Sequence, residues 1–127
     1  MIDKENEIFK AVATALRQKF KGIYVIGAEM SSAPPKFPAV SFVQTNNANK
    51  TEYATFDNIE NVVTEDYKAE VFSNLEQGKE AQTKEITRAI SDTMSDFGYE
   101  RTFCEIVPNV DATINRRMSR YRKNNVI

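Results

Sequence analysis

Apolar side chains recur with the period of an α-helix in two parts of the chain. Residues 3–20 and residues 78–97 each place them three or four positions apart, so each segment carries one apolar stripe. The spacing predicts two amphipathic helices whose stripes pack into a core. The stripes contain Ile8, Val12, Leu16 and Phe20 in the first segment and Ile86, Ala89, Ile90, Met94 and Phe97 in the second.

Residues at the ends of these segments suit helix termini. Asp3 is placed to cap the first helix, and Gly22 is expected to end it. Ser73 and Asn74 offer a cap ahead of the second helix. Gly98 suits the left-handed conformation that commonly follows a helix, so the second helix is expected to stop there.

Four shorter segments have the composition or alternation of strands. Residues 23–26 and 39–45 are β-branched and aromatic runs, separated by a proline-containing loop that cannot continue a ladder. Residues 99–107 and 112–122 lie on either side of a turn at 108–111. These last two segments predict a closing antiparallel hairpin.

The stretch that follows the second of these strands is polar. Residues 46–50 are expected to end strand 39–45, since they contain no apolar alternation. Residues 51–61 hold only isolated apolar side chains, among them Tyr53 and Phe56. Their pattern fits either a strand arm or an ordered loop.

Residues 62–72 alternate as a longer strand. Alternate side chains of a strand point to opposite faces, so one face is apolar and the other carries charges. The second face is therefore expected to meet solvent or a partner. The apolar face contains Val63, Tyr67, Ala69 and Val71, and the polar face contains Thr64, Asp66, Lys68 and Glu70.

The order of these elements predicts the fold class. A chain of 127 residues has the usual length of one domain with one core. Short turns between strands and only two helices favour an α+β fold, with an antiparallel or mixed β-sheet and two α-helices packed on one face. No apolar run is long enough to span a membrane, so a cytoplasmic origin is expected.

The chemistry available to the chain is limited, because it contains no histidine and one cysteine, Cys104. The commonest general base and the zinc sites built from cysteine and histidine are therefore missing. Glu65 and Asp66 point to opposite sides of a strand, and Asp92 and Asp96 lie on the solvent side of the second helix, so both pairs are expected to be solvated charges. We predict a non-enzyme without catalytic, metal-binding or cofactor-binding residues.

Charge is nearly balanced over the chain, at a formal net charge of −1, but residues 116–123 form a basic tract. In a strand, Arg116, Arg120 and Arg122 would share one side, while Arg117 and Tyr121 would share the other. Both sides of the tract are therefore basic.

Two interpretations of the basic tract remain open. In the first, it is an exposed edge strand whose charges deter unwanted pairing and meet Glu100 or Glu105 across the hairpin. In the second, it is a docking surface for an acidic neighbour or a lining near passing DNA.

Four segments in the second half of the chain carry a family resemblance. They are YKAEVFSN at 67–74, MSDFGY at 94–99, PNVDATI at 108–114 and RRMSRY at 116–121. Together with the helix that opens near Gly78, they resemble the tail terminator, or tail completion, proteins of long-tailed bacteriophages and prophages. The resemblance extends over residues 37–121.

The resemblance implies a structural virion protein. Such a subunit forms a hexameric ring on the head-proximal end of the tail tube, ends tube growth and provides the head-joining surface. Its partners would be copies of itself, the tail tube protein, and sheath or head-connector proteins, with DNA only as passing cargo and no membrane. It would be located in the virion tail, assembled in the host cytoplasm, of an infectious phage or a phage-tail-like particle.

Seven residues are candidates for interface contacts under this hypothesis. The candidates are Tyr53, Phe56, Arg116, Arg117, Arg120, Tyr121 and Arg122.

Two alternative functions remain. A head–tail connector, or neck, subunit would use the same kind of ring, and a small nucleic-acid-binding α+β module would use the arginine tract.

Overall fold

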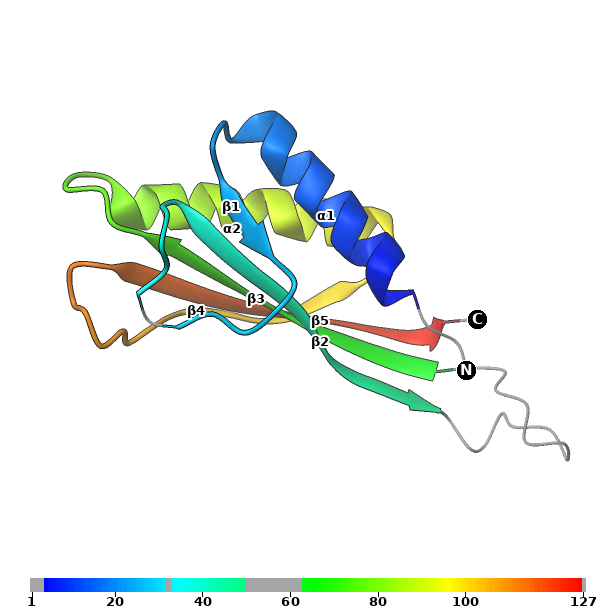
Figure 1. The fold of residues 1–127 in the computed structure, drawn as a ribbon. Coiled ribbons are helices and arrows are strands. Elements are labelled where there is room, and N and C mark those ends of the chain that lie inside the picture. Colours follow the sequence, from blue (N-terminus) through cyan, green and yellow to red (C-terminus); the bar gives the residue numbers. More distant parts are fainter. Residues whose placement is uncertain (1–3, 32, 50–62, 127) are drawn as a thin grey trace, which may run out of the picture.

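In the part of the chain that the structure describes, two helices cover one face of a five-stranded mixed sheet, as the sequence predicts (Figure 1). The computed structural model describes residues 4–31, 33–49 and 63–126. Neither helix in this part of the chain is both long and apolar enough to cross a membrane. The elements are α1 (Glu5–Lys19), β1 (Tyr24–Ile26), β2 (Ala39–Asn49), β3 (Val63–Ser73), α2 (Lys79–Asp96), β4 (Glu100–Val107) and β5 (Asn115–Val126).

The strands lie in the order β1-β2-β3-β5-β4. β1 and β2 are parallel, and the other neighbours are antiparallel. The closing hairpin of β4 and β5 is confirmed, but the first of the two interpretations of the basic tract, an exposed edge strand, is wrong. α2 carries the chain from β3 to the far side of the sheet, so β4 forms the edge and β5 returns between β3 and β4.

The helix ends differ in part from the predicted caps. Lys4 is the N-cap residue of α1, and Asp3 lies outside the described residues. Gly78, not Ser73 or Asn74, is the N-cap residue of α2. Ser73 instead completes β3, where its hydroxyl donates a hydrogen bond to the Gln82 side chain in the first turns of α2.

The predicted stop at Gly98 is confirmed. Gly98 has a φ of 85°, its amide donates to the Ser95 carbonyl at 2.9 Å, and the Tyr99 amide donates to the Met94 carbonyl at 2.9 Å. These paired hydrogen bonds form a Schellman motif, which satisfies two carbonyls at the end of α2.

Replacing Gly98 by alanine is expected to lower the free energy of unfolding by about 1–2 kcal/mol, because L-residues are strained at positive φ. An added Cβ would also lie 3.3 Å from Cε of Lys123. Gly22→Ala is the matched comparison for the contact with Lys123, since Gly22 has a φ of 78° and the same backbone strain but no neighbouring atom within 4 Å of an added Cβ. Urea unfolding measures both variants, and a stabilising Gly98→Ala would contradict the left-handed cap.

β2 is longer than predicted, since it continues through Asn49 instead of ending before residue 46. The register shifts between Gln44 and Asn46, after which pairing resumes and runs to the pair Asn49–Val63. The prediction failed because cross-strand hydrogen bonds hold these polar residues: the Asn46 side chain, for example, donates to Asp66 Oδ2 at 3.2 Å. Residues 51–61, with Tyr53 and Phe56, lie outside the described residues.

The main core lies between the helices and the sheet. Phe42 and Tyr67 stack with ring centroids 5.1 Å apart, and Tyr99 meets Tyr67 edge-on at 5.4 Å. Both predicted helix stripes contribute to this core, through residues such as Leu16 and Ile90. A smaller cluster lies on the opposite face of the sheet and consists of Met30, Ala39, Phe72 and Ile114.

Glu65 lies inside the main core, with no exposed surface. The Tyr99 hydroxyl donates to Glu65 Oε1 at 2.6 Å, and the Gln44 side chain donates to Oε2 at 2.9 Å. The prediction of a solvated carboxylate is therefore wrong for Glu65, which shares the helix-covered face of β3 with Tyr67. It is confirmed for Asp92 and Asp96, which are exposed on α2.

Candidate functional site

The face of the sheet opposite α1 and α2, here called the outer face, carries a dense group of charges. It receives alternate residues of β3 and β5, because their neighbours in sequence point into the main core. This alternation brings together three of the predicted interface residues, Arg116, Arg120 and Arg122. The outer-face charge cluster consists of these arginines with Asp66, Lys68, Glu70 and, from the loop after β1, Glu29.

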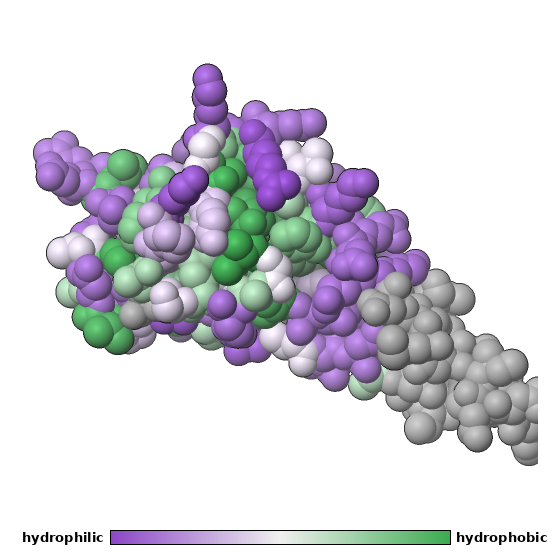
Figure 2. All heavy atoms as spheres, viewed as in Figure 1, coloured by the Kyte–Doolittle hydropathy of each residue, from purple (hydrophilic) through white to green (hydrophobic). Residues whose placement is uncertain are grey.

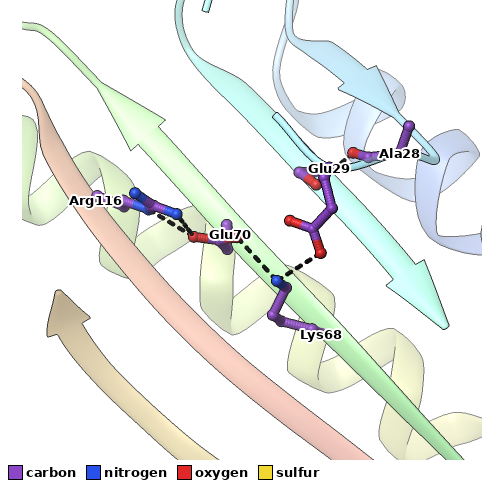
Figure 3. A network of polar contacts seen from close by, with 6 residues as sticks. Ala28, Glu29, Lys68, Glu70 and Arg116 are labelled. Atoms are coloured by element: carbon purple, nitrogen blue, oxygen red, sulfur yellow. Dashed lines mark hydrogen bonds and ion pairs between the residues drawn. The ribbon is translucent and has the colours of Figure 1, made fainter. Parts of the chain in front are cut away.

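Glu70 is the centre of the outer-face charge cluster and is only 1% exposed. Arg116 Nε donates to Glu70 Oε2 at 2.5 Å, and a terminal guanidinium nitrogen of Arg116 pairs with the same oxygen. Figure 3 shows Glu70 between Arg116 and Lys68, with Glu29 beyond Lys68. The expectation of a solvent-facing Glu70 is wrong, because neighbouring cations and the loop after β1 surround this part of the face.

Lys68 links two carboxylates across the outer face. Its Nζ lies 2.7 Å from Glu29 Oε1 and 3.3 Å from Glu70 Oε1. The contact with Glu70 is an ion pair without hydrogen-bond alignment, so Glu70 Oε1 has no hydrogen-bond donor among the described residues. Lys68 therefore attaches the loop to the sheet mainly through its hydrogen bond to Glu29.

Arg116 also contacts the smaller apolar cluster. Its guanidinium carbon lies 5.2 Å from the centre of the buried Phe72 ring. A cation over an aromatic face is attracted by the negative potential of that face. Arg116 is thus fixed both by Glu70 and by Phe72.

Asp66 and Arg122 form a second, more open ion pair. Arg122 Nε lies 2.7 Å from Asp66 Oδ1, and Arg122 Nη2 lies 3.3 Å from Oδ2. This hydrogen bonding lowers the pKa of Asp66 below its usual value, and burial opposes it only in part. Because the Arg122 side chain is 54% exposed, solvent screens the pair and its contribution to stability is small.

The remaining predicted interface residues are not all on the outer face. Arg120 is exposed there, whereas Arg117 points to the helix side and its Nε lies 3.4 Å from Thr83 Oγ1. Tyr121 is 1% exposed, and its hydroxyl is 2.8 Å from Ser91 Oγ. The interface prediction for Tyr121 is wrong, because an interior strand turns this side chain into the main core.

The pKa of Tyr121 also fits a core position. Burial raises the pKa of its hydroxyl above the usual value. Tyr53 and Phe56, the other two candidates, lie outside the described residues.

The outer face offers charged groups that can contact a partner. Among the described residues, no three or more His, Cys, Asp or Glu side chains are grouped so that they could hold a metal ion. No family model and no curated protein matches the chain. Function is therefore inferred from the fold, from the surface chemistry and from the resemblance carried by the four segments.

The sequence predicted neither the contact of Glu29 with Lys68 nor the burial of Glu70. In the structure Glu70 faces Met118 in the register, and Arg116 is the diagonal neighbour on the same face. Alternation of charge is visible in both segments, but the alignment of β3 with β5 is not. The loop contact of Glu29 with Lys68, separated by 39 positions, has no local pattern at all.

Proposed function

We propose that the protein is a tail terminator, a subunit that forms a ring on the head-proximal end of a phage or phage-like tail tube. Two findings support the proposal. The four segments that resemble this family fall on β3, the end of α2, the β4–β5 turn and β5, so they follow one another through the α+β fold. The outer face also presents Arg120 and the Asp66–Arg122 pair as polar contact groups.

Three strands of the sheet project beyond the helices and support the proposal most directly. β2, β3 and β5 extend beyond the layer of helices as a ribbon (Figure 1), and β2 stays paired with β3 up to Asn49 and Val63. Hydrophilic side chains predominate on this projecting part, whereas hydrophobic surface gathers nearer the middle of the molecule (Figure 2). A projecting, polar ribbon gives a subunit the reach to contact a neighbour in a ring or the tube below it.

The exposed edge of the sheet supports the same proposal. β4 pairs with β5 on one side, and on its other side it pairs with no described strand. Ile106 on this strand is 46% exposed. An unpaired strand with exposed apolar surface is suited to contact another chain.

A terminator acts through the surfaces it offers. One face of its ring matches the last ring of the tube, while the opposite face lacks the surface that recruits another tube ring. Tube growth ends because no template for the next ring remains. This mechanism needs no bond to be made or broken.

The proposal predicts that the purified protein assembles into rings and caps isolated tail tubes at one end. Electron microscopy of the protein mixed with tubes reports location and symmetry, and native mass measurement reports the number of subunits. A protein that remains monomeric and leaves tubes uncapped would contradict the proposal. Rings that bind empty heads and ignore tubes would instead indicate a neck subunit.

The projecting ribbon is tested by deleting residues 47–55, which removes the end of β2. We expect this variant to lose ring formation while α1 and α2 remain folded, as measured by circular dichroism. Val110→Ser is the matched control, because Val110 is 92% exposed in the β4–β5 turn, away from the ribbon. Unchanged rings that still cap tubes would exclude a role for the ribbon.

The nucleic-acid-binding alternative has less support. Arg116 and Arg122 of the basic tract are paired with Glu70 and Asp66, so much of the positive charge is already compensated within the chain. Binding through phosphate contacts depends on cations that replace counterions on the nucleic acid. The outer face therefore offers mainly Arg120 for such contacts.

A further inference from the structure

A hollow of about 310 Å³ lies on the helix side of the sheet, between α2 and β4. It forms because α2 packs mainly on β3 and β5 and less on the edge strand β4, so Arg101 is exposed and Cys104 is only half-buried. Arg101 and Cys104 of β4 point into this space from the same side as Tyr121 and Ser119 of β5. We call it the α2–β4 hollow.

Positive charge gathers around the α2–β4 hollow from three elements. Lys84 and Arg88 lie one turn apart on α2, Arg101 comes from β4, and Arg117 comes from β5. Among the described residues of the lining, Asp92 is the one carboxylate. The hollow therefore has an excess of cations, although the chain as a whole has a formal net charge of −1.

These four cations differ from those of the outer face. Arg116, Lys68 and Arg122 each have a carboxylate partner within 4 Å. Within the described part of the chain, none of the cations around the hollow forms such an ion pair. Their charge is thus available to a ligand.

An unpartnered hydroxyl adds a second, independent feature. Thr87 is 3% exposed and lines the hollow between Lys84 and Arg88, and its Oγ1 has no hydrogen-bond partner among the described residues. A buried polar group without a partner costs free energy, so most such groups are satisfied by protein, water or ligand. The neighbouring hydroxyl, Ser91 Oγ, is already bonded to Tyr121.

We propose that the α2–β4 hollow binds a phosphoryl group. Guanidinium groups match the oxygens of phosphate with paired donors, and the Lys84 ammonium adds further donors to the same anion. The volume is within the range of small-ligand sites, so it admits a phosphate together with part of the molecule that carries it. The phosphoryl group comes either from a free phosphate compound or from a nucleic-acid backbone, and the site does not depend on ring formation.

Inorganic phosphate is the first probe, with binding measured by titration calorimetry. Lys84→Gln combined with Arg88→Gln is expected to weaken phosphate binding about tenfold or more, because hydrogen bonds to charged groups are lost. Arg17→Gln combined with Lys21→Gln removes the same charge from exposed positions on and after α1, and should leave binding unchanged. Equal weakening by both pairs would overturn the proposal in favour of nonspecific attraction.

Cys104 provides a local readout of phosphate binding, because it is the only cysteine of the chain and lines the hollow. Phosphate is expected to slow its labelling by an uncharged thiol reagent, and Arg101→Gln should abolish that protection. Arg101 is exposed on an edge strand, so this variant is expected to fold. Labelling that phosphate does not slow would overturn the proposal.

A short DNA duplex at low salt distinguishes the two sources of the phosphoryl group. If the backbone is the ligand, the Lys84→Gln and Arg88→Gln pair should weaken DNA binding and phosphate should compete with it. If the ligand is a free phosphate compound, phosphate should bind while the duplex does not. Failure of both probes to bind would overturn the proposal, whatever the protein does with tail tubes.

Discussion

Replacing Tyr99 by phenylalanine is expected to lower the free energy of unfolding by about 2–3 kcal/mol, because a buried carboxyl group loses a hydrogen-bond donor. The Tyr99 hydroxyl lies 2.6 Å from Oε1 of Glu65, and Glu65 has no exposed surface. The aromatic ring itself is retained, so its edge-on contact with Tyr67 survives. Urea unfolding at neutral pH measures the loss.

Tyr24→Phe is the matched control for Tyr99→Phe. Tyr24 is only half-buried and packs at the smaller apolar cluster, away from Glu65. Its replacement should change the free energy of unfolding by less than about 0.5 kcal/mol, as is usual for a substitution outside such networks. Equal losses of unfolding free energy in the two variants would show that the hydrogen bond from Tyr99 to Glu65 does not stabilise the fold.

The same substitution should also change the response to alkaline pH. Burial raises the pKa of Tyr99 above its usual value, and the hydrogen bond to Glu65 raises it further. In the unfolded chain the hydroxyl ionises near pH 10, while in the folded protein it stays neutral. The stability from this group is therefore complete below about pH 10 and is lost above it, by about 1.4 kcal/mol per pH unit. In Tyr99→Phe, the free energy of unfolding should therefore fall less steeply above about pH 10, by that amount per pH unit.

Much of the fold was predictable because its elements are encoded locally. The stripes of α1 and α2 have helical period, the left-handed Gly98 ends α2, and the turn at 108–111 joins two strands. Each of these features depends on residues a few positions apart. The same holds for the alternation that placed Tyr67 and Asp66 on opposite faces of β3.

The order of strands was not predictable in this way. Charges along Arg116–Lys123 are compatible with an edge strand, but they are equally compatible with an interior strand whose neighbour supplies Glu70 and Asp66. Choosing between them requires the register of β3 with β5, which is set by contacts 46 to 56 positions apart in sequence. The candidate site was therefore found only in part, through Arg116, Arg120 and Arg122.

The α2–β4 hollow was missed for the same reason. Lys84 and Arg88 on α2 have the spacing of any solvated helix face. Only the tertiary fold brings Arg101 and Arg117 beside them. Thr87, which belongs to the same helix turn, is not part of the predicted apolar stripe but is buried in the structure.

Replacing Glu70 by alanine should cost about 2–3 kcal/mol of the free energy of unfolding. Removing one partner of a buried ion pair leaves the other charge uncompensated, which costs about 3–5 kcal/mol when both groups are fully buried. Arg116 retains 23% exposure, so part of its charge can be solvated in the variant and the loss is smaller. Chemical unfolding in low salt and in high salt measures it, and little salt dependence is expected for a pair this enclosed.

A double-mutant cycle separates this pair from its surroundings. Arg116→Met keeps an apolar stem over Phe72, so Glu70→Ala combined with Arg116→Met should cost at least about 1 kcal/mol less than the sum of the single variants. Asp66→Ala is the matched comparison on the same two strands, because its partner Arg122 is 54% exposed, and it should cost less than about 1 kcal/mol. Equal costs for Glu70→Ala and Asp66→Ala, or an additive cycle, would mean that Glu70 does not hold Arg116 in place. A larger cost for Glu70→Ala than for Asp66→Ala would instead show that enclosure by the loop after β1 fixes the pair of Glu70 and Arg116 at the centre of the outer face.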